Sequence, residues 1–159
     1  MSKVWVTADL HLGHINITKF RPQFSSVEEH NEFVIDNLLS TVGKRDKIFL
    51  LGDIVFKGGG KYAEILRSMA ANKVLVLGNH DGITGWANSV EAALGYKKSW
   101  LTHIPVHPQE LDYRKEFNIH GHLHETFIND PRYFNVSLEA TNYKPVLLED
   151  VLEQLRERN

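Results

Sequence analysis

The chain has no cysteine, no strong excess of positive charge and no apolar run of the roughly 20 residues that cross a membrane. The lack of cysteine excludes disulfides, thiolate metal sites and cysteine nucleophiles, and it is typical of a reducing compartment. The first residues lead directly into a strand-like segment without a signal-like apolar core, so we expect a cytoplasmic protein that has no membrane partner. The net charge of −2 argues against long nucleic acid as a partner.

The residues that are present describe an ordinary globular protein with one unusual feature. Hydrophobic residues make up 42% and charged residues 24% of the 159 positions, which predicts a single domain, residues 1–159, with a sizeable core. The unusual feature is nine histidines, five of which lie between positions 103 and 124.

The apolar pattern predicts a mixture of strands and helices. Strands are expected at Lys3–Ala8, Lys47–Leu51, Lys73–Leu77, Tyr96–Thr102, Phe117–Gly121, Tyr133–Leu138 and Lys144–Leu148. Helices are expected after a capping box at Ser26–Glu29, with Phe33, Val34, Leu38 and Leu39 as its apolar positions, and at Tyr62–Ala71, around Trp86–Leu94 and at Glu149–Arg158. Strands alternate with helices in the first half, as in a parallel α/β arrangement, whereas the strand-rich second half favours a mixed sheet or a pair of sheets.

Three buried strands end in polar residues of the same kind, in the runs VWVTADLH, IFLLGD and VLVLGNHD. Because the carboxyl ends of parallel strands meet at one edge of a sheet, we expect these polar side chains to converge. The residues concerned are Asp9, His11, Asp53, Asn79 and His80. If strand geometry persists, Asp9 and His11 project to the same side. The same alternation applies to His122 and His124 in NIHGHLH.

Carboxylate, imidazole and amide groups without thiolate favour divalent metals such as Mn, Fe, Ni or Zn. The groups are more numerous than one ion needs, and two ions about 3.5–4 Å apart that share a carboxylate would use all of them. Asp53 is the expected bridge, because it comes alone from the middle strand. A single Asp or His at a strand end is usually a turn former or a solvated side chain. Four such clusters at four strand ends favour a metal site.

Five short blocks of the sequence resemble the signature blocks of the calcineurin-like metallophosphoesterases. They are DLH at 9–11, GD at 52–53, GNHD at 78–81, His103 before Ile104-Pro105, and GHLH at 121–124. They occur in order over most of the chain, which looks like a small member without a cap domain. The resemblance implies an α/β fold, the four-layer α/β/β/α sandwich with mixed sheets, and a metal site at the carboxyl ends of the strands.

The resemblance also implies a role for each matching residue. Asp9, His11 and His124 would hold the first metal, and Asp53 would bridge the two ions. The residues that would complete the second metal are Asn79, His103 and His122. Such a site hydrolyses phosphoesters with metal-activated water and needs no protein nucleophile.

Other polar residues near these blocks have open roles. His80 is expected to donate a proton to the leaving group, and Asp81 either orients His80 or forms a turn or helix entry. His14 either reaches substrate or hydrogen-bonds a neighbour. His120 either orients a metal ligand or is a core histidine.

Four further features are interpreted as structural. His30 and His107 are expected on the surface, in a helix and a loop respectively. Arg21 is interpreted as a surface arginine, with a substrate phosphate contact as the alternative. The run Lys57–Lys61 lacks the ending of a Walker phosphate loop and is interpreted as a mobile rim loop.

These observations favour a phosphoesterase with two divalent ions, Mn first among them. We expect a small phosphoester substrate, and a phosphodiesterase acting on a small nucleotide-like or cyclic diester over a phosphomonoesterase. A nuclease acting on nucleic-acid ends is an alternative, and a non-catalytic metal-binding scaffold is the alternative from another class. A homo-oligomer is compatible with the sequence.

Overall fold

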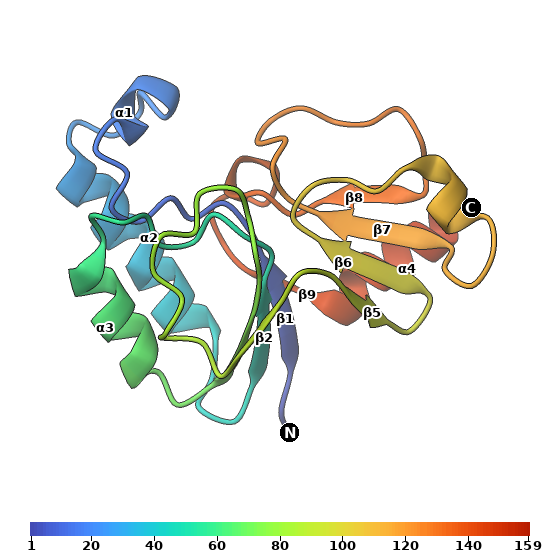
Figure 1. The fold of residues 1–159 in the computed structure, drawn as a ribbon, viewed down its shortest axis with the longest axis horizontal. Coiled ribbons are helices and arrows are strands. Elements are labelled where there is room, and N and C mark those ends of the chain that lie inside the picture. Colours follow the sequence, from blue (N-terminus) through green and yellow to red (C-terminus); the bar gives the residue numbers. More distant parts are fainter.

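The computed structural model describes residues 1–159 and contains two β-sheets and four α-helices (Figure 1). The strands are β1 Val4–Thr7, β2 Lys47–Leu50, β3 Asn72–Val76, β4 Ser89–Glu91, β5 Leu94–Tyr96, β6 Ser99–Thr102, β7 Phe117–His120, β8 Tyr133–Asn135 and β9 Val146–Leu147. The helices are α1 Ile17–Phe20, α2 Val27–Thr41, α3 Gly60–Ser68 and α4 Leu148–Arg158. None of these helices combines the length and the apolar character that crossing a bilayer requires.

The first sheet has the order β4-β3-β2-β1-β9, and its strands β1 to β4 run parallel to their neighbours. Strand β9 pairs antiparallel with β1. The second sheet has the order β5-β6-β7-β8, in which β6, β7 and β8 are parallel and β5 is antiparallel to β6. The carboxyl ends of β1, β2 and β3 therefore lie at one edge, as the sequence predicts.

Side-chain alternation along the strands divides the interior into two cores. Ile48 and Leu50 of β2 pack in the core under α2 and α3, whereas Phe49 and Leu51 face the second sheet. Figure 1 shows the resulting layers, with α2 and α3 on one side of the first sheet and the second sheet on the other. Both faces of the parallel strands are buried, which explains their nearly continuous apolar sequence.

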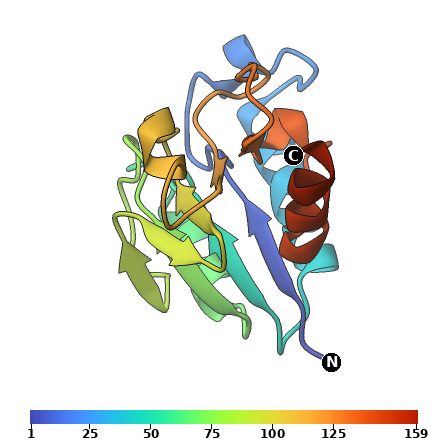
Figure 2. The ribbon, with the colours of Figure 1, turned by 90° about the vertical axis from the view of Figure 1, so that its right-hand side faces the viewer.

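Helix α4 covers the seam between the two sheets. It contacts β1 and β9 of the first sheet and β8 of the second. Figure 2 shows it beside β1, and its residues Val151, Leu152 and Leu155 belong to the core between the sheets. The expected α/β class with two mixed sheets is confirmed, and the helical layer on this side is the single helix α4.

The capping box predicted for α2 is present, because Oγ of Ser26 accepts a hydrogen bond of 3.0 Å from the backbone N–H of Glu29. Two of the expected apolar positions are wrong, however. Phe33 and Leu39 are nearly half exposed, at 45% and 46%. The buried face instead includes Ile35, a buried neighbour of the correctly predicted Val34 and Leu38.

The helix predicted around Trp86–Leu94 is wrong, since this segment contains β4 and the start of β5. Trp86, Val90 and Leu94 have a four-residue spacing that is typical of a helix face. In the structure Val90 pairs with Leu75 of β3, so the open edge of the first sheet recruits the segment as a strand. Trp86 packs in the core from a loop.

The glycine-rich run after β2 is shorter as a loop than predicted, because Gly60 and Lys61 already belong to α3. Gly59 precedes the helix and is buried. A Cβ atom at this position would lie 2.8 Å from the carbonyl oxygen of Leu12. Glycine is therefore needed where this loop touches the loop that follows β1.

Candidate metal centre

Most of the predicted metal ligands lie in strained turns beyond the strand ends. Strand β1 ends at Thr7 and β7 at His120, so the strand alternation predicted for the residues beyond them is wrong. The ligands with a positive φ are Asp9 (60°), His11 (55°), Asp53 (57°), His122 (72°) and His124 (52°). This left-handed backbone is unusual for residues other than glycine and clusters at functional sites.

One consequence of these turns is that neighbouring histidines of the sequence separate. His122 and His124 were expected on one side, but each belongs to a different group of candidate ligands. Asp9 and His11 do meet, although turns and not strand alternation bring them together. Gly52, with a φ of 88°, is part of this packing, because a Cβ atom there would lie 2.5 Å from Nδ1 of His103.

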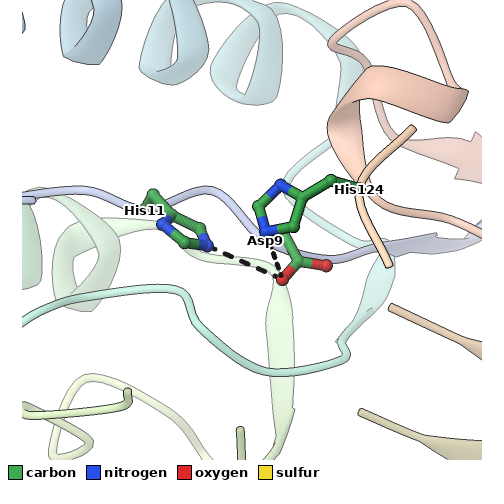
Figure 3. Close-up of side chains that lie close together, drawn as sticks. All are labelled: Asp9, His11 and His124. Atoms are coloured by element: carbon green, nitrogen blue, oxygen red, sulfur yellow. Dashed lines mark ion pairs between the residues drawn. The ribbon is translucent and has the colours of Figure 1, made fainter. Parts of the chain in front are cut away.

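The first group consists of Asp9, His11 and His124 (Figure 3). Oδ1 of Asp9 lies 3.7 Å from Nε2 of His11 and 3.9 Å from Nε2 of His124. The other oxygen of Asp9 is already used, because Oδ2 accepts hydrogen bonds from Oγ of Ser137 at 2.7 Å and from the backbone N–H of His122 at 2.8 Å. Asp9 is thus oriented with one oxygen directed at the two imidazoles.

The second group consists of Asp53, His103 and His122, with Asn79 beside it. Nδ1 of His103 donates to the carbonyl of Leu51 at 2.7 Å, so its Nε2 presents a lone pair. That nitrogen lies 3.0 Å from Oδ1 of Asn79, 3.2 Å from Nδ1 of His122 and 3.4 Å from Oδ2 of Asp53. Several electron-pair donors therefore converge on one small space.

Asp53 lies between the two groups. Its Oδ1 accepts a hydrogen bond of 2.8 Å from the backbone N–H of His80. Its Oδ2 lies 3.4 Å from Nε2 of His103 and 3.8 Å from Nε2 of His11, so one oxygen faces both groups. This is the placement that a bridging carboxylate requires.

The residues of the first group fit a divalent cation. Oδ1 of Asp9 and Nε2 of His11 are buried and have no hydrogen-bond partner, an arrangement that is costly unless another group satisfies them. Burial raises the pKa of Asp9, but the contact with His11 and the proximity of His103 and His124 outweigh this effect, so the net shift of the pKa is downward and the carboxyl is ionised at neutral pH. The donors are nitrogen and oxygen atoms, which suit Mn, Fe, Ni or Zn.

His124 is supported from outside the candidate centre by Glu139. Nδ1 of His124 lies 2.7 Å from Oε2 of Glu139, and Nε of Arg21 donates to the same oxygen at 3.0 Å. Burial would raise the pKa of Glu139, but these hydrogen bonds and the charge of Arg21 lower it to about 2. A carboxylate that accepts from Nδ1 of a histidine leaves Nε2 free and directed at a metal.

The surface locations predicted for Arg21 and His30 are both wrong. Arg21 is 1% exposed and His30 is fully buried. Nη1 of Arg21 donates to Nε2 of His30 at 2.8 Å, so the two buried side chains satisfy each other's polar atoms. His107 is exposed, as predicted.

A cavity of about 450 Å³ contains atoms of both groups. Its lining residues are His11, His14, Ile17, Phe20, Asp53, Phe56, Asn79, His80, His122, His124, Glu125 and Glu139. Four of these rings form a row, in which Phe20 stacks on His14, His14 on Phe56 and Phe56 on His80. The His14 and Phe56 planes are 13° apart with centroids at 4.7 Å, and Phe20 is 69% exposed.

His14 lies at the cavity wall with its Nδ1 3.2 Å from Nδ1 of His11. It therefore has the neighbour contact that one of its two predicted roles requires, and its contact with substrate stays a prediction. His80 is exposed and lines the same cavity. Its role as a proton donor stays a prediction.

Asp81 organises the loops around the centre. Its carboxylate accepts hydrogen bonds from the backbone N–H groups of Gly78 at 2.6 Å, Asp53 at 3.0 Å and Ile54 at 2.8 Å. None of these donors belongs to the His80 side chain. The observed contacts correspond to the turn-forming alternative of the sequence interpretation.

His120 is buried and makes its hydrogen bond with the carbonyl of Gly121, at 2.9 Å, rather than with a candidate ligand. Its ring packs edge-on against Tyr133. Burial lowers the pKa of His120 to about 4, so the ring is neutral. These contacts correspond to the core-histidine alternative.

Arg21, Ser137 and Glu139 are the supporting residues that sequence reasoning missed. Ser137 and Glu139 follow β8 and reach the centre through an isolated parallel bridge between Ser137 and Ala8. The pairing spans more than 100 positions, and no local motif marks it. The only signal was an arginine and an acidic residue of opposite charge, which is common on surfaces.

The fold and the two ligand groups define a protein with a candidate dinuclear metal centre. A family model described as "Calcineurin-like phosphoesterase" matches residues 2–158, and the chain belongs to this family. The resemblance inferred from the five sequence blocks is thereby confirmed. Family membership and the two ligand groups support metal-dependent phosphoester hydrolysis.

Similar proteins cover half or more of this chain, and their names state no activity. The chain is 36% identical to an uncharacterized protein of Methanocaldococcus jannaschii over 99% of this chain and 93% of that protein. It is 38% identical to the Gene 66 protein of Mycobacterium phage L5 over 52% of this chain and 41% of that protein. The crystal structure of a protein of unknown function from Aquifex aeolicus matches 96% of this chain and 99% of that chain, with a TM-score of 0.71 and 21% identity, which shows the fold alone.

Proposed function

We propose that the protein is a phosphodiesterase that hydrolyses a small nucleotide-like or cyclic phosphodiester with two divalent ions, preferentially Mn²⁺. Asp9, His11 and His124 would hold one ion, and Asn79, His103 and His122 the other, with Asp53 shared. When bound, the two ions would activate water and neutralise the phosphoryl oxygens. The chain's own residues orient these ligands, bind the substrate and supply a proton.

The composition of the cavity wall carries the preference for a diester. No lysine or arginine is among its lining residues, whereas Glu125 and Glu139 are. A phosphomonoester carries up to two negative charges at neutral pH, and sites for it gain from cationic side chains. A diester carries one negative charge, which two bound ions would neutralise without further cations. The wall therefore favours the less charged substrate.

His80 is the candidate donor for the leaving group. Its backbone is held by Asp53, and its ring stacks on Phe56 at a centroid distance of 5.2 Å. The side chain is exposed at the cavity, where an alkoxide leaving group would need a proton. An imidazole is suited to this role because its ordinary pKa lies close to neutrality.

The row of rings supports a substrate with a planar base. Phe20 ends the row and is mostly exposed at the rim of the cavity. Base–aromatic stacking is worth about 1–3 kcal/mol per base and tolerates different bases. We propose that a nucleobase of the substrate stacks at Phe20 while its phosphate lies at the ions.

The test is a comparison of bis(p-nitrophenyl) phosphate with p-nitrophenyl phosphate after reconstitution with Mn²⁺. We expect a higher kcat/KM for the diester. A strong preference for the monoester would overturn the diesterase proposal while leaving phosphoester hydrolysis intact. If the metal-loaded protein hydrolyses neither ester, nor cyclic nucleotides or dinucleotides, a non-catalytic scaffold explains the fold better.

We also propose that the protein acts in the cytoplasm on a diffusing small molecule. Its net charge of −2 and the lack of Lys and Arg in the cavity wall give a long phosphate backbone little to bind. A nuclease would instead show nucleic-acid binding that weakens steeply with salt. Self-association is compatible with this proposal and is measured by sedimentation.

A further inference from the structure

Arg21 is a fully buried cation with every donor used. It directly follows α1 and is 1% exposed. An arginine has five N–H donors in a fixed plane. The acceptors are Oε2 of Glu139 at 3.0 Å, Oε1 of Glu139 at 2.9 Å, the carbonyl of Asp9 at 2.6 Å, the carbonyl of Leu10 at 3.3 Å and Nε2 of His30 at 2.8 Å. Because every N–H group has an acceptor, the plane of the guanidinium is fixed.

These contacts join the two chain segments that make up the first ligand group. The carbonyls of Asp9 and Leu10 belong to the strained turn that carries Asp9 and His11. Glu139 in turn accepts from Nδ1 of His124, which lies on the other segment. The guanidinium of Arg21 thus holds the backbone of the first segment in place. Through the carboxylate of Glu139 it also fixes the orientation of the His124 imidazole on the second segment.

The second ligand group has no such support from this pair. None of the five hydrogen bonds of Arg21 goes to a residue of the Asp53–His103–His122 group. His103 is oriented separately, by the carbonyl of Leu51 at 2.7 Å. The Arg21–Glu139 pair is therefore specific to one of the two candidate sites.

The buried Arg21–Glu139 ion pair makes contacts beyond the one between its own two charges. Burying two charges costs several kcal/mol per ion, which their attraction repays only when the geometry and the remaining hydrogen bonds are good. Here the pair holds a metal-directed histidine and a strained ligand turn in addition to being buried. A bidentate Arg–carboxylate contact fixes orientation as well as charge.

We propose that Arg21 and Glu139 are positioning residues for one of the two ions, the one held by Asp9, His11 and His124. Glu139 keeps Nε2 of His124 directed at Oδ1 of Asp9, and Arg21 fixes Glu139 and the Asp9 backbone together. The inference rests on the proposed function in one respect, namely that the two groups bind metal. It predicts that disturbing the pair weakens one ion and leaves the other in place.

The test is a Mn²⁺ titration of the full chain after chelation, followed by calorimetry and by electron paramagnetic resonance. The variant is Glu139→Gln, and the matched control is Glu153→Gln, the same change on the exposed face of α4, outside the cavity. We expect two bound ions in the wild type and the control. In Glu139→Gln, one ion should bind about 10–100-fold more weakly, with the other changed less than about threefold. At two equivalents of Mn²⁺ per chain, the wild type should give the electron paramagnetic resonance signal of two spin-coupled ions. Glu139→Gln should not give this signal.

If the ion pair were merely structural, Glu139→Gln would weaken the binding of both ions equally, or the binding of neither. Either result overturns the proposal. Thermal unfolding of the metal-free variants reports whether the fold is intact. If Glu139→Gln unfolds, Glu139→Asp serves instead, because it keeps the charge for Arg21 but withdraws the carboxylate from His124. Normal binding of both ions by Glu139→Asp would then refute the inference. A wild type that binds fewer than two ions would refute the proposed function itself.

Discussion

The buried His30 makes the stability of the protein depend on pH in mild acid. Its Nε2 accepts from Arg21, and its Nδ1 lies 2.8 Å from Oδ1 of Asn31, so the native ring is neutral. Burial lowers the pKa of His30 from 6.5 to about 4. The unfolded chain therefore binds a proton at this ring first as the pH falls. The stability from the neutral ring is complete above pH 6.5 and is lost toward pH 4, with a loss of about 2 kcal/mol already at pH 5.

The assay is urea unfolding of the wild type and of His30→Gln in chelator, between pH 8 and pH 4.5. A glutamine retains an acceptor for Arg21 but does not titrate in this range. Because the carboxylates of both proteins titrate alike, the difference between the two curves isolates His30. We expect the wild type to lose about 2 kcal/mol more than the variant between pH 7.5 and pH 5. Parallel curves would refute the assignment of a neutral, accepting His30.

Three further predictions concern the active centre. His80→Ala should retain both ions by metal analysis but lose on the order of 100-fold in kcat on esters with poor leaving groups, with a smaller loss on p-nitrophenyl esters; equal losses on both would remove its role as a proton donor. Gly78→Ala should destabilise the protein by about 1–3 kcal/mol in thermal unfolding, because its Cβ would lie 2.5 Å from the backbone nitrogen of Asp53. Gly60→Ala is the control and should not destabilise the protein, because a Cβ atom there would have no atom within 4 Å. Phe20→Ala should raise the KM for a dinucleotide by about 5–150-fold and leave the KM for a diester without a ring unchanged. An equal change for both substrates would exclude base stacking.

The sequence predicted the arrangement of the parallel strands and the location of the candidate site. Both predictions depend on local features, namely apolar runs that end in polar residues and a parallel order that brings such ends together. Asp9, His11 and Asp53 accordingly lie together at the expected edge. The side-chain directions at this edge were predicted less accurately, because the residues after β1 and β7 adopt left-handed torsions that a pattern of strand alternation does not indicate.

Long-range polar pairing was the part that the sequence did not predict. A buried arginine is favourable only when a distant carboxylate meets it, and Arg21 and Glu139 are 118 positions apart. His30 was misplaced for the same reason, since Nε2 of its buried ring is paired with the distant Arg21. The Trp86–Leu94 segment failed differently, because a three-residue edge strand is too short to show alternation.

The left-handed torsions at five candidate ligands also affect how the protein would respond to selection for heat resistance. Glycine adopts these torsions freely, whereas each other residue costs about 1–2 kcal/mol there. We therefore expect glycine substitutions at these positions to relieve backbone strain in the metal-free protein. Because the same five residues are candidate metal ligands, we expect such substitutions to weaken metal binding, so a screen that scores only thermal stability would select proteins that lack the metal centre.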